Sequence, residues 1–188
     1  MSTLVTTTAQ IGTIKDAGGN ATAMTLDSGG RVTMPARPAF ACHLETTVAL
    51  DGQNGWGGTS GGNSLSSGSW NWQITHGGYN IGGHHDLSTN TFTAPIAGLY
   101  AFTASCVMAA AGNAVSFRLV QAGGTSSYRY AGLNFSNGQT VNSPSNHGQF
   151  LMAVNDTVTI QVGYTRSNSV EGDSGGFGRT WWSGYFVG

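Results

Sequence analysis

The sequence predicts an all-β protein, and three observations support this prediction. Glycine accounts for 30 of the 188 residues, whereas charged residues make up only 8%. Aromatic residues make up 10% of the chain, and Val and Thr are abundant, so the sequence lacks the composition of a disordered chain. Short alternating runs of apolar residues recur between glycine-rich turns without helical periodicity. A series of eight to ten such strands is typical of a sandwich or jelly roll.

Residues 1–36 differ from the rest of the chain because they contain no aromatic side chain. Two turn signals, KDAGGN and LDSGGR, separate three β-prone runs, Ile11–Ile14, Ala23–Leu26 and Val32–Met34. A segment without aromatic residues builds little core of its own. Pro35 and Pro38 then favour an extended connector. We therefore expect a short extended N-terminal arm over residues 1–36 and a folded domain over residues 37–188.

The expected strands of the second part follow in order. Ala39–Leu50 predicts the first strand, and residues 51–69 predict a glycine- and serine-rich loop without periodicity. A short aromatic strand follows at SWNWQ, and another begins at Phe92, interrupted by Pro95 and Gly98 because both residues break a strand ladder.

The C-terminal half carries the clearest alternation. In LYAFTASCVMA, every second residue from Tyr100 to Met108 lies on one face, and in AVSFRLVQAGG the residues Val115, Phe117 and Leu119 do the same. A strand in SSYRYAGLNF runs toward an Asn-Gly turn. GQFLMAVNDTVTIQVGYT predicts two strands about a tight turn near Asn155, and RTWWSGYFVG predicts the closing strand.

Few side chains indicate catalysis. The sequence has no G-x-S-x-G motif, and its acidic residues are scattered, so we expect no enzyme activity. His84, His85 and Asp86 form the most metal-like run, which His76 could join. Neighbouring side chains on an extended segment point to opposite faces, however, so a polar turn is the favoured interpretation. We expect no cofactor and two buried free thiols at Cys42 and Cys106.

The charge and hydropathy of the chain indicate which kinds of partner it can bind. The net charge is −1 and no basic stripe is present, which argues against nucleic acid. No apolar run has the ~18 residues of a membrane span, and the N-terminus lacks the pattern of a secretory signal. The tryptophans fit core packing, except that Trp56 sits among glycines and could face a sugar or protein partner. His84 and His85 are further candidates for ligand-facing residues.

The motif FTAPIAGLYAF, Phe92 to Phe102, resembles a signature of the complement C1q globular head, a relative of the tumour necrosis factor (TNF) family. The segments HHDLSTNTFTAP, AVSFRLVQAGG, FLMAVNDTVTIQV and WWSGYFVG resemble further motifs of that family in the same order. The resemblance covers residues 37–188. Two departures are His85, where the family often has an aromatic residue, and Asn155, where it usually has glycine.

The resemblance implies a ten-stranded jelly-roll sandwich that assembles as a homotrimer. It assigns to the core or the trimer interface Phe40, Phe92, Gly98, Tyr100, Phe102, Phe117, Trp182 and Tyr185. Relatives sometimes bind calcium near the trimer apex. Asp51, Glu171 and Asp173 are the weak candidates for such a metal site here, and solvated loop acids are the favoured interpretation.

The arm resembles leaders that precede such modules in structural proteins of marine tailed bacteriophages. We therefore expect a non-enzymatic structural protein on the virion surface, as a capsid fibre, decoration or tail-associated knob. Residues 1–36 would bind other virion structural proteins. The alternative is a module that binds a glycan or protein receptor on the host cell surface.

Overall fold

The computed structural model describes residues 13–15, 22–26, 28–34, 37–50, 55–56, 70–107, 115–122, 129–136, 145–164, 168–172 and 179–188. The chain divides into two compact units, Met1–Arg37 and Pro38–Gly188. This division lies one residue from the boundary expected between arm and domain. The described part of the chain contains no helix with the length and hydropathy of a membrane span.

Unit 1, Met1–Arg37, is a small antiparallel sheet in the order β1-β2-β3, with β1 at Thr13–Lys15, β2 at Thr22–Leu26 and β3 at Val32–Thr33. The β-prone runs of the expected extended arm therefore pair with one another. The reason is the turn signal LDSGGR, in which Gly30 adopts a φ of 76° and lets Leu26 pair with Val32.

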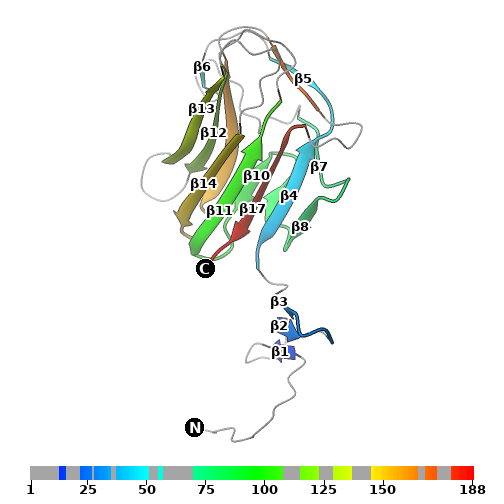
Figure 1. Cartoon of the computed structure of the whole chain (residues 1–188). Coiled ribbons are helices and arrows are strands. Elements are labelled where there is room, and N and C mark those ends of the chain that lie inside the picture. Colours follow the sequence, from blue (N-terminus) through cyan, green and yellow to red (C-terminus); the bar gives the residue numbers. More distant parts are fainter. Residues whose placement is uncertain are drawn as a thin grey trace, which may run out of the picture. The chain divides into compact units, whose positions relative to one another are not determined.

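Unit 2, Pro38–Gly188, contains two six-stranded antiparallel sheets (Figure 1). Sheet I has the order β14-β11-β17-β4-β7, and β8 also pairs with β4. Its strands are β4 (Ala39–Leu44), β7 (Trp72–Gln73), β8 (Tyr79–Ile81), β11 (Gly98–Ser105), β14 (Ser145–Met152) and β17 (Trp181–Phe186).

Sheet II has the order β13-β12-β15-β10-β9, and β6 also pairs with β15. Its strands are β6 (Gly55–Trp56), β9 (His85–Asp86), β10 (Thr91–Thr93), β12 (Val115–Ala122), β13 (Arg129–Ser136) and β15 (Thr157–Tyr164). A separate pair joins β5 (Val48–Leu50) to β16 (Asn168–Val170).

The chain changes sheets repeatedly, which is the connectivity of a jelly roll. It passes from β10 in sheet II to β11 in sheet I, then to the β12–β13 hairpin in sheet II, and to β14 in sheet I. The expected number of ten strands differs from the structure. The predicted first strand, Ala39–Leu50, divides into β4 and β5 at residues 45–47, and two- and three-residue strands add to the total.

The two strands expected about Asn155 are not a hairpin. β14 pairs with β11 in sheet I, whereas β15 pairs with β12 and β10 in sheet II. The turn passes the chain from one sheet to the other. Asn155 has a φ of 68°, and the carboxylate of Asp156 accepts hydrogen bonds from the backbone N–H of Ala153 and the side-chain amide of Gln121, both at 2.9 Å.

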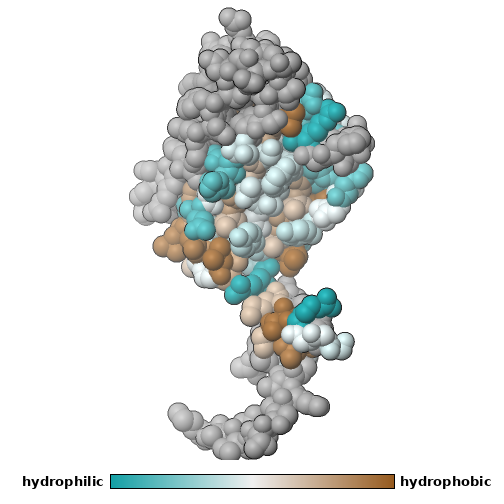
Figure 2. All heavy atoms as spheres, in the orientation of Figure 1, coloured by the Kyte–Doolittle hydropathy of each residue, from teal (hydrophilic) through white to brown (hydrophobic). Residues whose placement is uncertain are grey.

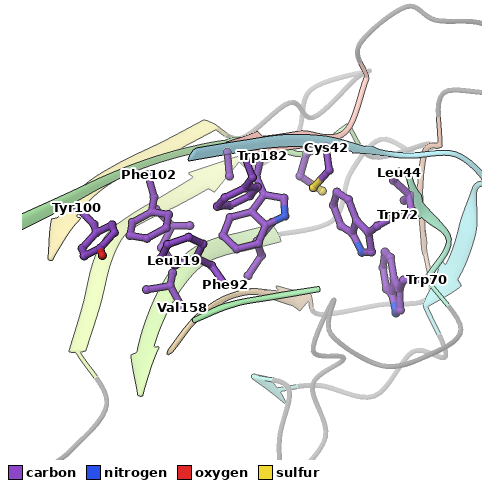
Figure 3. Close-up of a cluster of buried hydrophobic side chains, with 14 of the residues drawn as sticks. Cys42, Leu44, Trp70, Trp72, Phe92, Tyr100, Phe102, Leu119, Val158 and Trp182 are labelled. Atoms are coloured by element: carbon purple, nitrogen blue, oxygen red, sulfur yellow. The ribbon is translucent and has the colours of Figure 1, made fainter. Parts of the chain in front are cut away.

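Aromatic rings from both sheets fill the space between them (Figure 3). Phe40 lies at the centre, with its ring centroid 4.5 Å from Trp182 and 5.4 Å from Phe92. Tyr100 packs 5.4 Å from Phe92 and donates a hydrogen bond from its hydroxyl to the Ile96 carbonyl at 2.9 Å. The row continues past Trp182 to Trp72 and Trp70, so the core runs along the length of the sandwich.

Two glycines permit this packing. A Cβ at Gly184 in β17 would overlap the rings of Phe102 and Phe40. A Cβ at Gly98, where β11 begins with a φ of +154°, would overlap the ring of Phe186. Both positions therefore require glycine because aromatic side chains lie directly on the backbone.

Candidate functional site

The outer face of sheet I is the candidate site. Side chains alternate along β11, β14, β17 and β4, so every second residue points away from the core. The strand register aligns these residues in rows across the sheet. One row contains Gln149, Ala101, Tyr185, Ala39 and Ile81, and the next contains His147, Thr103, Ser183, Ala41 and Tyr79. We call these two rows, with the Leu99–Leu151 pair beside them, the assembly face.

No side chain of the assembly face carries a carboxylate, an ammonium or a guanidinium group. Leu151 is 68% exposed and Tyr185 is 54% exposed. Small side chains, alanine, serine and threonine, stand between the larger residues, and Tyr185 lies in the middle of its row on β17. Figure 2 views this side of the molecule, with pale residues over the middle of the sheet.

The apolar character increases toward one end of sheet I. Ile96, Leu151, Val154 and Val187 are exposed where β11 begins and β14 ends. Brown residues gather at this end in Figure 2. An uncharged face with aromatic and aliphatic side chains has the composition of the core of a protein interface, where charged residues are depleted.

The residues that the resemblance assigns to core or trimer occupy different environments. Five of them are at most 1% exposed, namely Phe40, Phe92, Tyr100, Phe102 and Trp182. Tyr185 instead points outward on the assembly face, and Gly98 opens β11. The side chain of Phe117 lies outside the described residues.

His85 does not face a ligand, which corrects that interpretation. Its side chain is 2% exposed and stacks on Phe40, with ring centroids 4.3 Å apart. Its Nε2 lies 3.0 Å from Oδ1 of Asn90. Burial lowers the pKa of His85 to about 4, although the Asn90 hydrogen bond partly opposes this shift. The imidazole thus takes the place of an aromatic core residue.

Of the three calcium candidates, Glu171 lies among the described residues. Glu171 pairs with Arg179, with 2.5 Å between Oε2 and Nη1. Asp51 and Asp173 lie outside the described residues, as does the side chain of Trp56. His84 is half-buried near Gly82. Cys42 and Cys106 are both buried and free, and burial raises the pKa of Cys106 to about 12.

A cluster that the sequence did not reveal is formed by His43, Glu45 and His76. One ligand atom from each lies within 4.8 Å of those of the other two. His43 and Glu45 are two residues apart in CHLE, which places them on one side of β4, but His76 is far along the chain. Only knowledge that β4 pairs with β7 would have predicted that His76 lies near His43 and Glu45.

Comparisons with known proteins agree with this architecture. No family model matches the sequence, and no curated protein matches it at a significant level. Solved structures do match. The globular domain of a zebrafish complement 1qA protein aligns with a TM-score of 0.50 and 14% identity, covering 80% of this chain and 98% of that chain.

Two TNF-type structures are similar to the same extent. Murine APRIL at pH 8.0 gives a TM-score of 0.56 at 8% identity, covering 80% of this chain and 99% of that chain. Eiger TNF from S. frugiperda gives a TM-score of 0.52 at 9% identity, covering 81% of this chain and 93% of that chain. At these identities the comparisons establish the fold: unit 2 is a C1q/TNF-like jelly roll.

Proposed function

We propose that this protein is a non-enzymatic structural module that forms a homotrimer through the assembly face. The observation that carries the proposal is the absence of charge across two complete rows of sheet I. Each row extends over five strands. Its outward side chains are alanine, serine, threonine, tyrosine and isoleucine, with Gln149 and His147 at the β14 edge.

Shape and composition favour a closed assembly of identical chains. The small side chains of the face allow the sheets of neighbouring copies to approach closely. Tyr185 supplies apolar area in the middle of its row, and Leu151 supplies it at the β14 edge. Three copies related by a threefold axis would bury this face without leaving an open edge for further growth. Sheet II differs, because its described residues include Arg118, whose guanidinium donates two hydrogen bonds to the side-chain oxygen of Gln161.

The test is to place a carboxylate on the assembly face. Thr103 is exposed in the single chain and lies within its row between His147 and Ser183, so Thr103→Glu should leave the fold intact and prevent trimer formation. Gln161→Glu adds the same charge to sheet II, where Arg118 can pair with it, and serves as the matched control. Circular dichroism should show the same strand content in all three proteins.

In light scattering, the parent protein and Gln161→Glu should have three times the 19.4 kDa chain mass, and Thr103→Glu should have the mass of one chain. A parent protein that is monomeric at micromolar concentration would contradict the proposal. A trimeric Thr103→Glu variant would place the interface on another face.

We further propose that the trimer belongs to a bacteriophage virion as a capsid fibre, decoration or tail-associated knob, held there by residues 1–36. The resemblance of the arm to phage leaders supports this location. So does unit 1 itself, a sheet of short strands that leaves Leu26, Val32 and Met34 exposed for a partner. Receptor or glycan binding through Trp56 and His84 stays a prediction, which glycan arrays and adsorption assays would test.

A further inference from the structure

Sheet I has an irregular edge beside β4. Gln73 in β7 pairs with His43, and Tyr79 in β8 pairs with Ala41. Residues 74–78 therefore lie opposite the single residue Cys42. The chain leaves the ladder for this short stretch and returns to it, as in a large β-bulge, a feature that re-aims side chains at functional sites. We call residues 74–78 the edge excursion.

The edge excursion contains a tight turn whose geometry selects particular residues. The N–H of Gly78 donates to the carbonyl of Thr75 at 3.3 Å, and the two residues between them have positive φ, 55° at His76 and 90° at Gly77. Two positive φ values are typical of a type I′ turn, which favours Asn or Gly at the first of these positions. The sequence instead has histidine there.

Close packing fixes the turn against β4. A Cβ at Gly78 would lie 2.7 Å from the carbonyl oxygen of Ala41 and 2.7 Å from the Cα of Ile74. Only glycine fits at this point, so the excursion is held against the sheet. The backbone position of His76 is therefore fixed. Residues with a strained backbone, such as this histidine with positive φ, are often found at functional sites.

The turn places the ring of His76 beside the ring of His43, with 5.4 Å between the ring centroids. His43 Nε2 lies 3.0 Å from Oε2 of Glu45 and 3.3 Å from the hydroxyl of Thr75. His43 is largely buried, Glu45 is half-buried and His76 is exposed, so the group is rigid on one side and open to solvent on the other.

Two imidazoles and one carboxylate are the donor set of many three-ligand zinc sites. With bonds of about 2.1 Å, two ligands of a tetrahedral ion lie about 3.4 Å apart. The His43–Glu45 distance of 3.0 Å is close to that value, and all three donor atoms already lie within 4.8 Å of one another. His76 is the exposed member of the group, so its side chain has the room to move toward the other two ligands.

We propose that His43, Glu45 and His76 bind one divalent transition-metal ion of the zinc class per chain. Imidazole nitrogen suits zinc, copper and nickel, whereas calcium and magnesium prefer all-oxygen sites. Three protein ligands leave a further position for water or for a partner's group. The bound ion would fix the edge excursion to β4. The site uses donors from a single chain, so no residue of a neighbouring copy is needed to complete the set of three ligands.

The experiment titrates Zn²⁺ into the tag-free, metal-stripped full-length protein by calorimetry. His76→Asn removes one ligand while Asn tolerates positive φ, so the turn is retained. Glu45→Gln removes the carboxylate at constant size. His84→Asn is the matched control, because it removes a histidine from outside the cluster. Thermal unfolding without metal verifies that each variant is folded.

We expect saturable binding with one ion per chain, weakened at least ten-fold by His76→Asn and by Glu45→Gln and unchanged by His84→Asn. Co²⁺ should give the intense visible absorption of a tetrahedral site in the parent protein and lose it in His76→Asn. No saturable Zn²⁺ binding, one ion per three chains, equal weakening by His84→Asn, or displacement of Zn²⁺ by equimolar Ca²⁺ would each overturn the proposal.

Discussion

Asn90 connects two buried rings in the core. Its Oδ1 lies 3.0 Å from Nε2 of His85 and accepts a hydrogen bond from the indole N–H of Trp182 at 2.7 Å. A carbonyl oxygen only accepts, so Nε2 of His85 carries the proton of the neutral ring. Nδ1 of His85 is buried and has no hydrogen-bond partner among the described residues. A proton on Nδ1 would thus create a buried cation, which explains the low pKa of this histidine.

This pKa predicts a pH-dependent stability. The folded pKa is about 4 and the ordinary value is 6.5, so the unfolded chain binds the proton more readily between these two values. The contribution of His85 is fully present above pH 6.5 and is lost progressively as the pH falls to about 4. The total loss from the difference in pKa is about 3 kcal/mol. Urea unfolding from pH 7 to pH 4 measures it.

The control for this prediction is His85→Phe, which keeps a ring beside Phe40 and removes the titrating group. The slope of the unfolding free energy between pH 4 and 6.5 should become smaller in this variant. An identical slope in the two proteins would mean that another group controls the acid sensitivity.

Asn155 provides a test of backbone strain. Its φ of 68° is tolerated by asparagine and glycine but is unfavourable for a β-branched residue. Asn155→Gly should therefore change the unfolding free energy little, whereas Asn155→Val should lower it by about 1–2 kcal/mol. Chemical denaturation of the two variants gives both values. Equal stability of Val and Gly at this position would contradict the left-handed conformation of the turn.

At the scale of the elements, alternation in the sequence was sufficient to place β11 and β17. Tyr100 and Phe102 point into the core and Ala101 and Thr103 point outward, as the period of two requires. The same alternation does not predict which strands pair with one another. The turn at Asn155 looks like a hairpin in sequence, yet its strands belong to different sheets, because long-range partners decide the pairing.

Prediction of the sites was limited for the same reason. Sequence analysis identified histidines by their adjacency, and adjacency placed His85 in the candidate ligand site although its ring is buried. His43 and His76 are separated by 32 intervening positions and meet only because the edge excursion interrupts the pairing of β7 and β8 with β4. The outer face of sheet I likewise depends on registers between strands far apart in sequence.

Phe102 tests the role of β11 as an inner strand of sheet I, between β14 and β17. Its ring is 1% exposed and packs against Phe92, Phe150 and Trp182. Phe102→Ala should lower the unfolding free energy by about 3–5 kcal/mol because it leaves a cavity in a close-packed core. Thr103→Ala, on the outer side of the same strand, removes no core contact and should change it far less than Phe102→Ala does. A melting temperature of Phe102→Ala within a degree or two of the parent would refute the strand assignment.

At the scale of the whole molecule, the two units have different means of stabilisation. Unit 2 buries an extended aromatic core between its sheets. Unit 1 has no aromatic residue. Leu26 and Val32 are exposed on its short strands, and Met34 is exposed just after β3. We expect a sheet of three such short strands to gain stability from a partner that pairs with its edge strands.

This difference predicts the result of deleting residues 1–36. The deletion ends one residue before unit 2 begins, so it removes no strand of sheet I or sheet II and leaves the assembly face complete. The truncated protein should remain folded and trimeric in light scattering, and it should no longer copurify with virions. The full-length chain carrying Gln161→Glu is the control, since it retains both units. Full occupancy of virions by the truncated protein would place the anchor in unit 2, and a truncated protein that cannot trimerise would show that unit 1 takes part in assembly.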